Sequence, residues 1–513
     1  MKKIMAEDIV TKIFNVLSII LFVILFCLSI MESWVNDWDL VSEYVSPVPD
    51  SLLSNLLWLV GILLIGCLFC QIRKKWKPAI NMDIVAAILS VAACAFSIYW
   101  VSASNTAPQA DQLIVCSYAE AFDLGDCSGL EKGGYIAINP QQLGLLTVIR
   151  VLFRLFDAGN YVAFQYFNAL LIPVIIFFGY QIVKRLSRNS FGAETVFLML
   201  MAVCVPLYCY VPFVYGEVSS TALVMLAGWM FLSCLEKFSY AKLIVLSLAM
   251  GGAVLCRQNA LIFLIAFLGV VVVKICVKPD RKVISMACGM VAGVLLFQGA
   301  IWGIYNRVTP EDSHGMPAIL YITMGVNDDN GMAGWHNWYN MSTFAENDYD
   351  VERASAVAKK DLREFFEKCL DDPAYAVDFY YRKMSSQWNA PMYHCLAMNN
   401  MFAGERSAFV ENVYFGDLRK FVEEGMNVYQ LLIYGGVLAV LIFRRKKWTG
   451  IENYILLIGV FGGFLFSLMW EAKTRYVFPY FVIMIPYAAI GITECVRCLS
   501  AKAERHIGKG GAK

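Results

Sequence analysis

The feature that most constrains this chain is the repetition of long apolar runs. About twelve of them are long enough to cross roughly 30 Å of hydrocarbon. Charged residues make up only 16% of the chain, whereas a soluble domain carries roughly 25%. We therefore predict an all-α integral membrane protein with about 12 transmembrane helices, near residues 12–31, 52–71, 82–102, 160–183, 192–213, 219–235, 241–256, 259–276, 283–304, 427–443, 453–470 and 476–495.

The charges between the runs predict the orientation. Basic residues gather in alternate connections, at 71–77, 184–188, 274–282 and 444–447, and in the tail from Arg497. The other connections are acidic or neutral. By the positive-inside rule both termini lie in the cytoplasm. The first run lacks a small-residue cleavage site, so it is interpreted as a span and not as a signal peptide. We expect a multi-pass protein of a bacterial plasma (inner) membrane, because the start is lysine-rich and eukaryotic targeting features are not apparent.

The spans and connections divide the chain into four parts. Residues 1–81 form an N-terminal transmembrane hairpin, and 82–304 form a core whose outer loop, 102–160, contains interfacial helices. Residues 305–426 are polar and predict a small, mostly helical extracytoplasmic domain. Its clearest helix is 351–370, which ends before a proline that disfavours helix in the preceding residue. Residues 427–513 form the C-terminal transmembrane helices and a cytoplasmic tail.

The outer loop carries one carboxylate just beyond a span. Asp111 lies in the first turn of a predicted amphipathic helix, residues 111–122. The helix dipole favours an ionised carboxylate at this end. An ionised acid at the membrane surface can act as a base towards a group arriving from water. The alternative is an ordinary acidic residue at a helix N-terminus.

Two further features of this loop have more than one interpretation. Arg150 and Arg154 are four residues apart on an apolar helix, residues 140–156, which should lie in the interface plane. They either bind a lipid phosphate or extend to the headgroups. Cys116 and Cys127 both lie outside the membrane, so a disulfide between them is left open.

Other ionisable residues lie at the same membrane face. Ionisable groups at or inside a membrane are costly and often functional. Glu217 lies between two spans, Arg257 follows the seventh span, and the last span begins with three more, Glu471, Lys473 and Arg475. A base with several cations and carboxylates on one face suits an anionic lipid substrate. The alternative is that each charge only anchors the end of a span.

Four short motifs together resemble a known class. From about residue 82 onwards the chain is similar to the C-type membrane glycosyltransferases, which include the protein mannosyltransferases and the lipid A aminoarabinose transferase. Two departures are apparent: the loop follows the third span, and a second acid is replaced by Gln112, which weighs against a protein acceptor. The motifs are Pro108-Gln-Ala-Asp111-Gln112, Tyr135-x4-Pro140-Gln141-x2-Gly144, Tyr215-Gly216-Glu217 and Glu471-x3-Arg475-Tyr476-x2-Pro479.

The resemblance implies an inverting glycosyltransferase. Its donor would be a sugar linked to polyprenyl phosphate, and its acceptor a hydroxyl of a glycan, glycolipid or protein at the outer face. Asp111 would be the catalytic base. Arg475, Arg257 and Lys473 would bind the donor phosphate. The residues that would contact donor or acceptor sugar are Glu217, Tyr215, Gln112, Glu471, Tyr476 and Trp335. Trp335 and Trp338 could equally belong to an aromatic belt at the interface.

Other chemistries find little support in the sequence. His314, His336, His394 and His506 show no metal-ligand spacing such as His-x3-His. A divalent cation held by Asp111 and Glu217 is left open, and no other cofactor and no nucleic-acid partner is implied. The rival functions are a transporter or flippase, which usually shows repeat symmetry, and a polysaccharide polymerase or ligase, which would use an outer loop centred on arginine and histidine.

Overall fold

The fold is all-α apart from one short hairpin, as the sequence predicts. The computed structural model describes residues 2–75 and 80–510, so part of the predicted basic connection 71–77 lies outside the described residues. In this described part, ten helices are long and apolar enough to cross a membrane. The long helices are α1 (Lys2–Met31), α2 (Leu52–Lys75), α3 (Met82–Ser104), α7 (Tyr161–Ser187), α10 (Glu217–Glu236), α12 (Leu261–Val277), α13 (Arg281–Tyr305), α19 (Asp417–Arg444), α20 (Ile455–Met469) and α21 (Thr474–Gly510).

The remaining two predicted spans take other forms. Helix α11 (Tyr240–Cys256) has 17 residues and runs back along α10. Its end therefore lies beside the start of α10, where Arg257 forms an ion pair with Glu217. The predicted span at 192–213 is broken into α8 (Phe191–Ala202) and the short α9 (Val205–Cys209). Pro206, in the first turn of α9, explains the break, since it has no backbone N–H to continue the hydrogen bonds of α8 and its ring clashes with the preceding turn. The structure confirms an all-α polytopic membrane protein, and within the described residues these two segments are apolar helices shorter than a full span.

Buried and partly buried ion pairs mark one end of the helix bundle. Lys184 contacts Asp83 at 2.6 Å, and Arg444 contacts Glu494 at 2.6 Å. Lys274 lies 2.6 Å from Glu7, a residue near the start of α1. These pairs join the ends of helices that the positive-inside rule assigns to the cytoplasm. The cytoplasmic placement itself stays a prediction.

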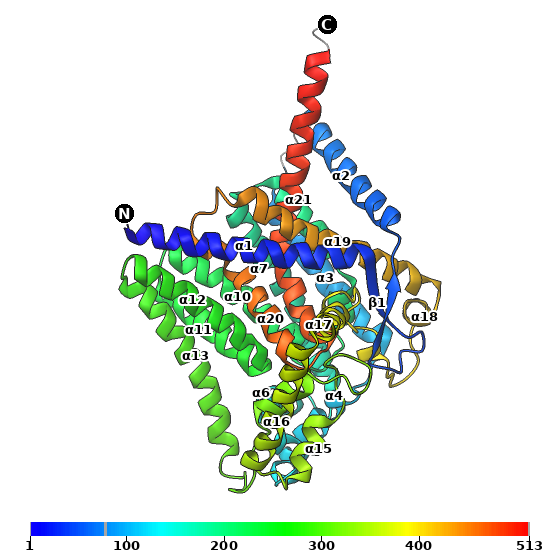
Figure 1. Cartoon of the computed structure of the whole chain (residues 1–513), viewed down its shortest axis with the longest axis vertical. Coiled ribbons are helices and arrows are strands. Elements are labelled where there is room, and N and C mark those ends of the chain that lie inside the picture. The colour runs from blue at the N-terminus through cyan, green and yellow to red at the C-terminus, as the bar shows by residue number, and fades with distance from the viewer. Residues whose placement is uncertain (1, 76–79, 511–513) are drawn as a thin grey trace.

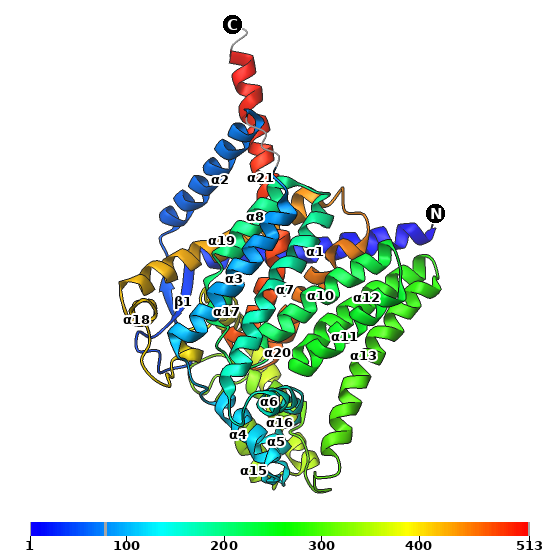
Figure 2. The same ribbon diagram turned by 180° about the vertical axis from the view of Figure 1, so that it is seen from behind.

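Helix α21 lies at the centre of the bundle and α2 at its edge. In the most apolar stretch of α21 89% of residues are buried, against 6% in α2. Both views show α21 running through the molecule and continuing beyond it to the C-terminus, with α2 beside its upper part (Figures 1 and 2). The central helix begins inside the molecule, and the first two residues of α21, Thr474 and Arg475, are buried.

The outer segments gather around the start of α21. Helices α4, α6, α15 and α16 lie at the end of the molecule opposite the C-terminus (Figures 1 and 2). The predicted helices 111–122 and 351–370 are confirmed as α4 and α16; whether 305–426 is a separate domain stays a prediction. The outer helices are α4 (Asp111–Asp123), α5 (Tyr135–Ile138), α6 (Leu143–Leu155), α14 (Ala318–Gly325), α15 (Tyr339–Glu346), α16 (Val351–Asp371), α17 (Pro373–Trp388) and α18 (Ala408–Phe415).

One element was not predicted at all. Residues between α1 and α2 form an antiparallel hairpin of β1 (Glu32–Asn36) and β2 (Val45–Pro49), with Trp34 opposite Pro47. The backbone N–H of Trp34 donates to the carbonyl of Asn389 at 2.9 Å. The hairpin is therefore fastened to the segment that follows α17.

Side-chain caps set where several helices begin. Asn160, Ser190 and Asp350 each accept a hydrogen bond from a backbone N–H in the first turn of α7, α8 and α16. These side chains satisfy N–H groups that a helix end leaves without partners. Asp372 caps α17 in the same way directly after α16, so the two helices turn sharply on Asp372 and Pro373.

Candidate active site

Asp111 begins helix α4 at the partly open edge of the site. Its side chain is 35% exposed. The preceding residue, Ala110, has φ of 48° and ψ of −129°. A non-glycine residue rarely adopts positive φ, and such strain is often found where a functional side chain must be aimed. The local backbone thus holds Asp111 in one orientation while leaving it open to water.

Each oxygen of the Asp111 carboxylate accepts one hydrogen bond. The Tyr135 hydroxyl donates to Oδ1 at 3.1 Å, and Arg475 Nη2 donates to Oδ2 at 3.0 Å. Burial raises the pKa of Asp111, but the charges of Arg475 and Lys473 and these two hydrogen bonds outweigh it, so its pKa lies below the ordinary value. Asp111 is therefore ionised at neutral pH and can accept a proton.

Arg475, the second residue of α21, is almost fully buried. Its Nη1 donates to the Met398 sulfur at 3.8 Å, and its guanidinium lies 5.2 Å from the centre of the Tyr215 ring and 5.3 Å from that of Tyr476. Aromatic faces stabilise a desolvated cation. Its Nε–H has no hydrogen-bond partner within the described chain. One donor of a buried cation is thus left for a ligand.

A second arginine lies against the same two rings. Arg257 Nη1 is 2.7 Å from Glu217 Oε1, and Glu217 is fully buried. The Arg257 guanidinium lies 5.7 Å from the Tyr215 ring and 5.2 Å from the Tyr476 ring. Its Nε also finds no partner among residues 2–75 and 80–510. The two arginines, far apart in sequence, form one cationic group.

Lys473 is neutralised by two carboxylates. Its Nζ lies 2.7 Å from Glu43 Oε2 and 3.7 Å from Glu471 Oε1. The Tyr476 hydroxyl donates to Glu471 Oε2 at 2.9 Å. Burial raises the pKa of Glu43, yet the charges of Lys473 and Arg475 hold it below the ordinary value. Glu43 comes from the β1–β2 connection, so the N-terminal hairpin contributes a charge to this site.

The other predicted contact residues are placed differently. Gln112 is buried, and both ends of its amide are bonded: the amide donates to the Met398 carbonyl at 2.9 Å and accepts from the Val214 N–H at 2.8 Å. Gln142 donates to the Tyr215 hydroxyl. Gln112 and Tyr215 therefore hold loops around Arg475 in place.

The two tryptophans lie in a neighbouring cluster. Trp335 is buried, donates from Nε1 to Ser386 Oγ at 2.9 Å, and packs against the rings of Tyr44 and His394. Trp338 is 64% exposed. Of the two rings, only that of Trp338 presents an open surface.

Two adjoining hollows lie beside the arginines. Both are narrow: the first, here called the polar hollow, and the second, the apolar hollow, have room for about 10 Å³ and about 20 Å³, the size of about one water molecule each. They share Asn259, Tyr476 and Tyr480. The polar hollow is lined by Asn259, Gln387, Gly463, Phe466, Ser467, Trp470, Glu471, Tyr476, Val477 and Tyr480. The apolar hollow is lined by Ser220, Thr221, Val224, Arg257, Asn259, Ala260, Phe263, Tyr476, Pro479, Tyr480 and Ile483.

The chain is similar in structure to two archaeal oligosaccharyltransferases. Both are from Archaeoglobus fulgidus. One, solved with an inhibitory peptide and a dolichol-phosphate, is 11% identical with a TM-score of 0.33, and the match covers 72% of this chain and 43% of that chain. The other, tethered to an acceptor peptide containing the NVT sequon, is 13% identical with a TM-score of 0.33 and coverages of 68% and 40%.

The chain thus spans less than half the length of either protein. No family model matches the sequence, and no curated protein matches it. A TM-score this low transfers no activity from those enzymes, so the chemistry has to follow from the residues of this chain.

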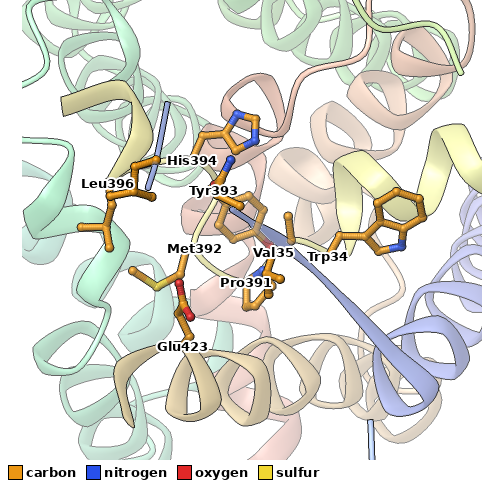
Figure 3. Close-up of a pocket in the computed structure, with 11 residues that line it drawn as sticks. Trp34, Val35, Pro391, Met392, Tyr393, His394, Leu396 and Glu423 are labelled. Carbon is orange, nitrogen blue, oxygen red and sulfur yellow. The ribbon is translucent and has the colours of Figure 1, made fainter. Parts of the chain in front are cut away.

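A further narrow hollow, with room for about 10 Å³, lies between the hairpin and residues 390–396. Figure 3 shows His394 and Glu423 at opposite ends of the residues that line it. His394 is buried, and burial lowers its pKa to about 3, so the ring is neutral. Within the described chain its two nitrogens have no hydrogen-bond partner. None of the residues lining this hollow bonds to Asp111 or Arg257 there, and we do not include it in the site.

The structure also resolves the two open features of the outer loop. Arg150 and Arg154 both donate to Asp123 Oδ1, at 2.6 Å and 2.7 Å for their Nη2 atoms, and so join α6 to the end of α4. Cys116 and Cys127 are both free thiols in the structure.

No three histidine, cysteine, aspartate or glutamate side chains in the described chain are grouped to hold a metal ion. The two carboxylates for which a divalent cation was left open, Asp111 and Glu217, each face an arginine. A cation between them stays an open alternative.

Sequence reasoning missed three contributors to this region. Tyr135 belongs to a quoted motif but was given no role, and Glu43 and Gln387 were not considered. Glu43 lies in a connection that appeared to be only acidic, and Gln387 lies at the end of a polar helix. Neither position carries a pattern that points to the site, because both reach it through tertiary contacts.

Proposed function

We propose that this protein is an inverting glycosyltransferase that transfers a sugar from a polyprenyl-phosphate-linked donor to an acceptor hydroxyl at the outer membrane surface. One observation carries the proposal: an ionised, partly exposed Asp111 is held by buried Arg475, beside a second arginine that lines an apolar hollow. A base and a group of phosphate donors therefore meet at one point.

The base and the cations have separate tasks in this reaction. Asp111 takes the proton of the acceptor hydroxyl as its oxygen attacks the anomeric carbon from the side opposite the phosphate. The new bond joins the acceptor oxygen to that carbon, and the bond from the carbon to the phosphate oxygen breaks. The electron pair leaves with the polyprenyl phosphate, which gains one negative charge. Inversion follows from this single displacement.

The leaving phosphate needs donors that are already in place. Arg257 and Arg475 each keep an Nε–H without a partner in the described structure, and their guanidinium groups lie on shared tyrosine rings. Preorganised donors in a site that excludes water stabilise developing charge strongly. Lys473, already paired with Glu43 and Glu471, would act on the phosphate through its field more than by direct contact.

The balance of charges in the site indicates that a phosphate would be bound by hydrogen-bond donors and not by an excess of positive charge. Arg257, Lys473 and Arg475 face four carboxylates: Glu43, Asp111, Glu217 and Glu471. The site therefore has no excess positive charge to attract any anion. A phosphate gains most where it can accept the unpaired N–H groups of Arg257 and Arg475.

The acceptor would approach Asp111 from the exposed side, and the donor from the bilayer. We propose that this exposed side faces away from the cytoplasm, in keeping with the charges of the connections. A glycan, a glycolipid or a protein hydroxyl could take part in the same displacement.

Transfer of labelled sugar from polyprenyl-phosphate donors in membranes tests the proposal. We expect wild type to transfer and Arg475→Ala to lose transfer together with donor binding. Arg444→Ala is the matched control, because Arg444 is also a buried arginine paired with a carboxylate but lies at the other end of the bundle. If wild type moves intact donor across vesicle membranes and transfers nothing, the protein is a flippase and the proposal fails.

A further inference from the structure

The connection between β1 and β2 is fastened at both ends. Arg419, a buried residue of α19, donates from Nη1 to the Trp38 carbonyl at 2.6 Å, and its guanidinium lies 4.7 Å from the centre of the Trp38 ring. At the other end the Tyr44 hydroxyl donates to the His336 carbonyl at 3.2 Å, and the Tyr44 ring packs against Trp335. The short stretch between these fastenings is therefore held against the outer segments of the molecule.

A strained turn aims this stretch at the site. Leu40 has φ of 58° although its side chain is buried. A non-glycine residue rarely adopts positive φ, and such a conformation persists only where the surrounding structure holds it. Three residues later, the partly exposed Glu43 side chain reaches the buried Lys473 ammonium at 2.7 Å. The connection thus brings a carboxylate from the water side onto a buried cation.

Lys473 does not require Glu43 for its neutralisation. Glu471 already lies 3.7 Å from the Lys473 Nζ and is itself held by the Tyr476 hydroxyl. Glu43 is the fourth carboxylate beside three cations, so it makes the site negative overall. Burial raises the pKa of Glu43, but the charges of Lys473 and Arg475 lower it more, so Glu43 is ionised. An additional negative charge beside the phosphate donors opposes the binding of an anion.

The two lipid phosphates of the proposed reaction differ in charge. The donor is a phosphodiester with one negative charge. The released polyprenyl phosphate is a monoester whose second pKa is about 6, so it carries nearly two negative charges at neutral pH. A fixed charge acts on each ligand in proportion to the charge of that ligand. In free energy, Glu43 therefore repels the product about twice as strongly as the donor.

We propose that Glu43 determines the selectivity of the site between its two lipid phosphates: it weakens the binding of the polyprenyl phosphate product more than that of the donor, and so promotes product release. This inference rests on the proposed function, since the product is the leaving group of that reaction. Glu43 acts by its charge and by engaging one N–H of the Lys473 ammonium, so it is a positioning residue and not the base.

Binding of two matched ligands to the purified full chain in nanodiscs of zwitterionic lipid tests this role. Polyprenyl phosphate and its methyl ester, polyprenyl methyl phosphate, have the same lipid chain and differ by about one charge at about pH 8. Glu43→Gln removes the charge and keeps the size of the side chain, and Glu43→Ala is a second neutral variant. Glu43→Asp keeps the charge. Asp37→Asn is the matched control, because it removes an exposed carboxylate from the same connection.

We expect Glu43→Gln to bind polyprenyl phosphate about tenfold more tightly than wild type does, and the methyl ester about threefold, as follows for one charge acting over several Å. Both gains should shrink as the ionic strength rises. Glu43→Ala should behave as Glu43→Gln does, whereas Glu43→Asp and Asp37→Asn should bind both ligands as wild type does. In transfer assays, added polyprenyl phosphate should inhibit Glu43→Gln at about tenfold lower concentration.

Two results would overturn the inference while leaving the proposed function intact. In the first, the neutral variants of Glu43, shown to be folded by thermal unfolding in detergent, bind both ligands no more tightly than wild type does. In the second, they gain equally for the two ligands, which would exclude a discrimination by charge. If wild type binds neither ligand, the proposed function fails as well.

Discussion

Arg475 Nη2 lies 3.0 Å from Asp111 Oδ2, although the two residues are 364 positions apart in the sequence. The contact joins the outer loop to the first turn of the central helix. It has two consequences. The arginine lowers the pKa of Asp111, which keeps the base ionised, and it places the cation that would receive the leaving phosphate beside the group that activates the acceptor.

Removal of the Tyr135 hydroxyl should change the pH dependence of transfer. Tyr135 donates to the other oxygen of Asp111, and this hydrogen bond is one cause of its lowered pKa. The base must be ionised, so activity falls as pH falls through the pKa of Asp111. In Tyr135→Phe that pKa rises, so the acid limb of kcat/KM should move to higher pH, while activity at neutral pH, where Asp111 stays ionised in both proteins, changes little.

A purely structural role for Tyr135 would lower activity equally at every pH. Tyr118→Phe is the control, because the Tyr118 ring stacks on Tyr135 with centres 6.5 Å apart but its hydroxyl is not bonded to Asp111. An unmoved acid limb in Tyr135→Phe would contradict the assignment.

Two variants should separate the role of Arg257 in stability, through its ion pair with Glu217, from its role in donor binding. Glu217 is fully buried, so Arg257→Gln leaves its charge unpaired, and breaking a buried ion pair in this way costs about 3–5 kcal/mol. The double variant Arg257→Gln/Glu217→Gln should regain most of the thermal stability in detergent. Because the phosphate donor is still missing, it should not regain donor binding.

Recovery of both stability and donor binding in the double variant would show that Arg257 serves only to neutralise Glu217. Failure to recover stability would show that the pair contributes more than mutual neutralisation.

Lys383 should make stability depend on pH. It is fully buried, and its Nζ donates to the carbonyls of Gly325 and Trp470. Burial lowers its pKa to about 7. The unfolded lysine keeps its proton up to about pH 10.4, so between these two values the unfolded state binds more protons and stability rises with pH. Below about pH 7 Lys383 is charged in the folded state as well, so the full cost of burying its charge lowers the free energy of unfolding.

Thermal unfolding of the full chain in detergent across this window measures the effect. Wild type should become more stable from about pH 7 to about pH 9, and Lys383→Met should show a smaller rise with pH. Equal slopes in the two proteins would contradict the lowered pKa. Lys368→Met is a control, because Lys368 lies at the exposed end of the neighbouring α16.

The parts of the fold set by local pattern could be predicted from the sequence. Helix α4 follows from its amphipathic periodicity and α16 from a polar helix that ends before Pro373, and both agree within a residue or two. The interrupted crossing α8–α9 was predicted as one span because hydropathy averages over Pro206. The hairpin β1–β2 was missed because its strands are short and contain charged residues and prolines.

The site divides in the same way. Charges at the outer ends of spans identified Asp111, Glu217, Arg257 and Arg475, since an ionisable group at a membrane boundary is unusual in any context. Which of these residues form ion pairs could not be predicted from the sequence, because the pairing depends on which helices pack together. The expected contact of Gln112 with sugar stays a prediction; its hydrogen bonds to the Val214 and Met398 loops depend on tertiary contacts that no local pattern records.

Single-turnover transfer by Asp111→Asn tests the central claim most directly. With donor binding measured alongside, the variant should bind donor within about threefold of wild type and transfer at least about 100-fold more slowly, as expected when a general base is removed. Asp123→Asn, at the other end of α4, is the matched control and should transfer normally. Transfer by Asp111→Asn at the wild-type rate would contradict the assignment of the base and, with it, the proposed mechanism.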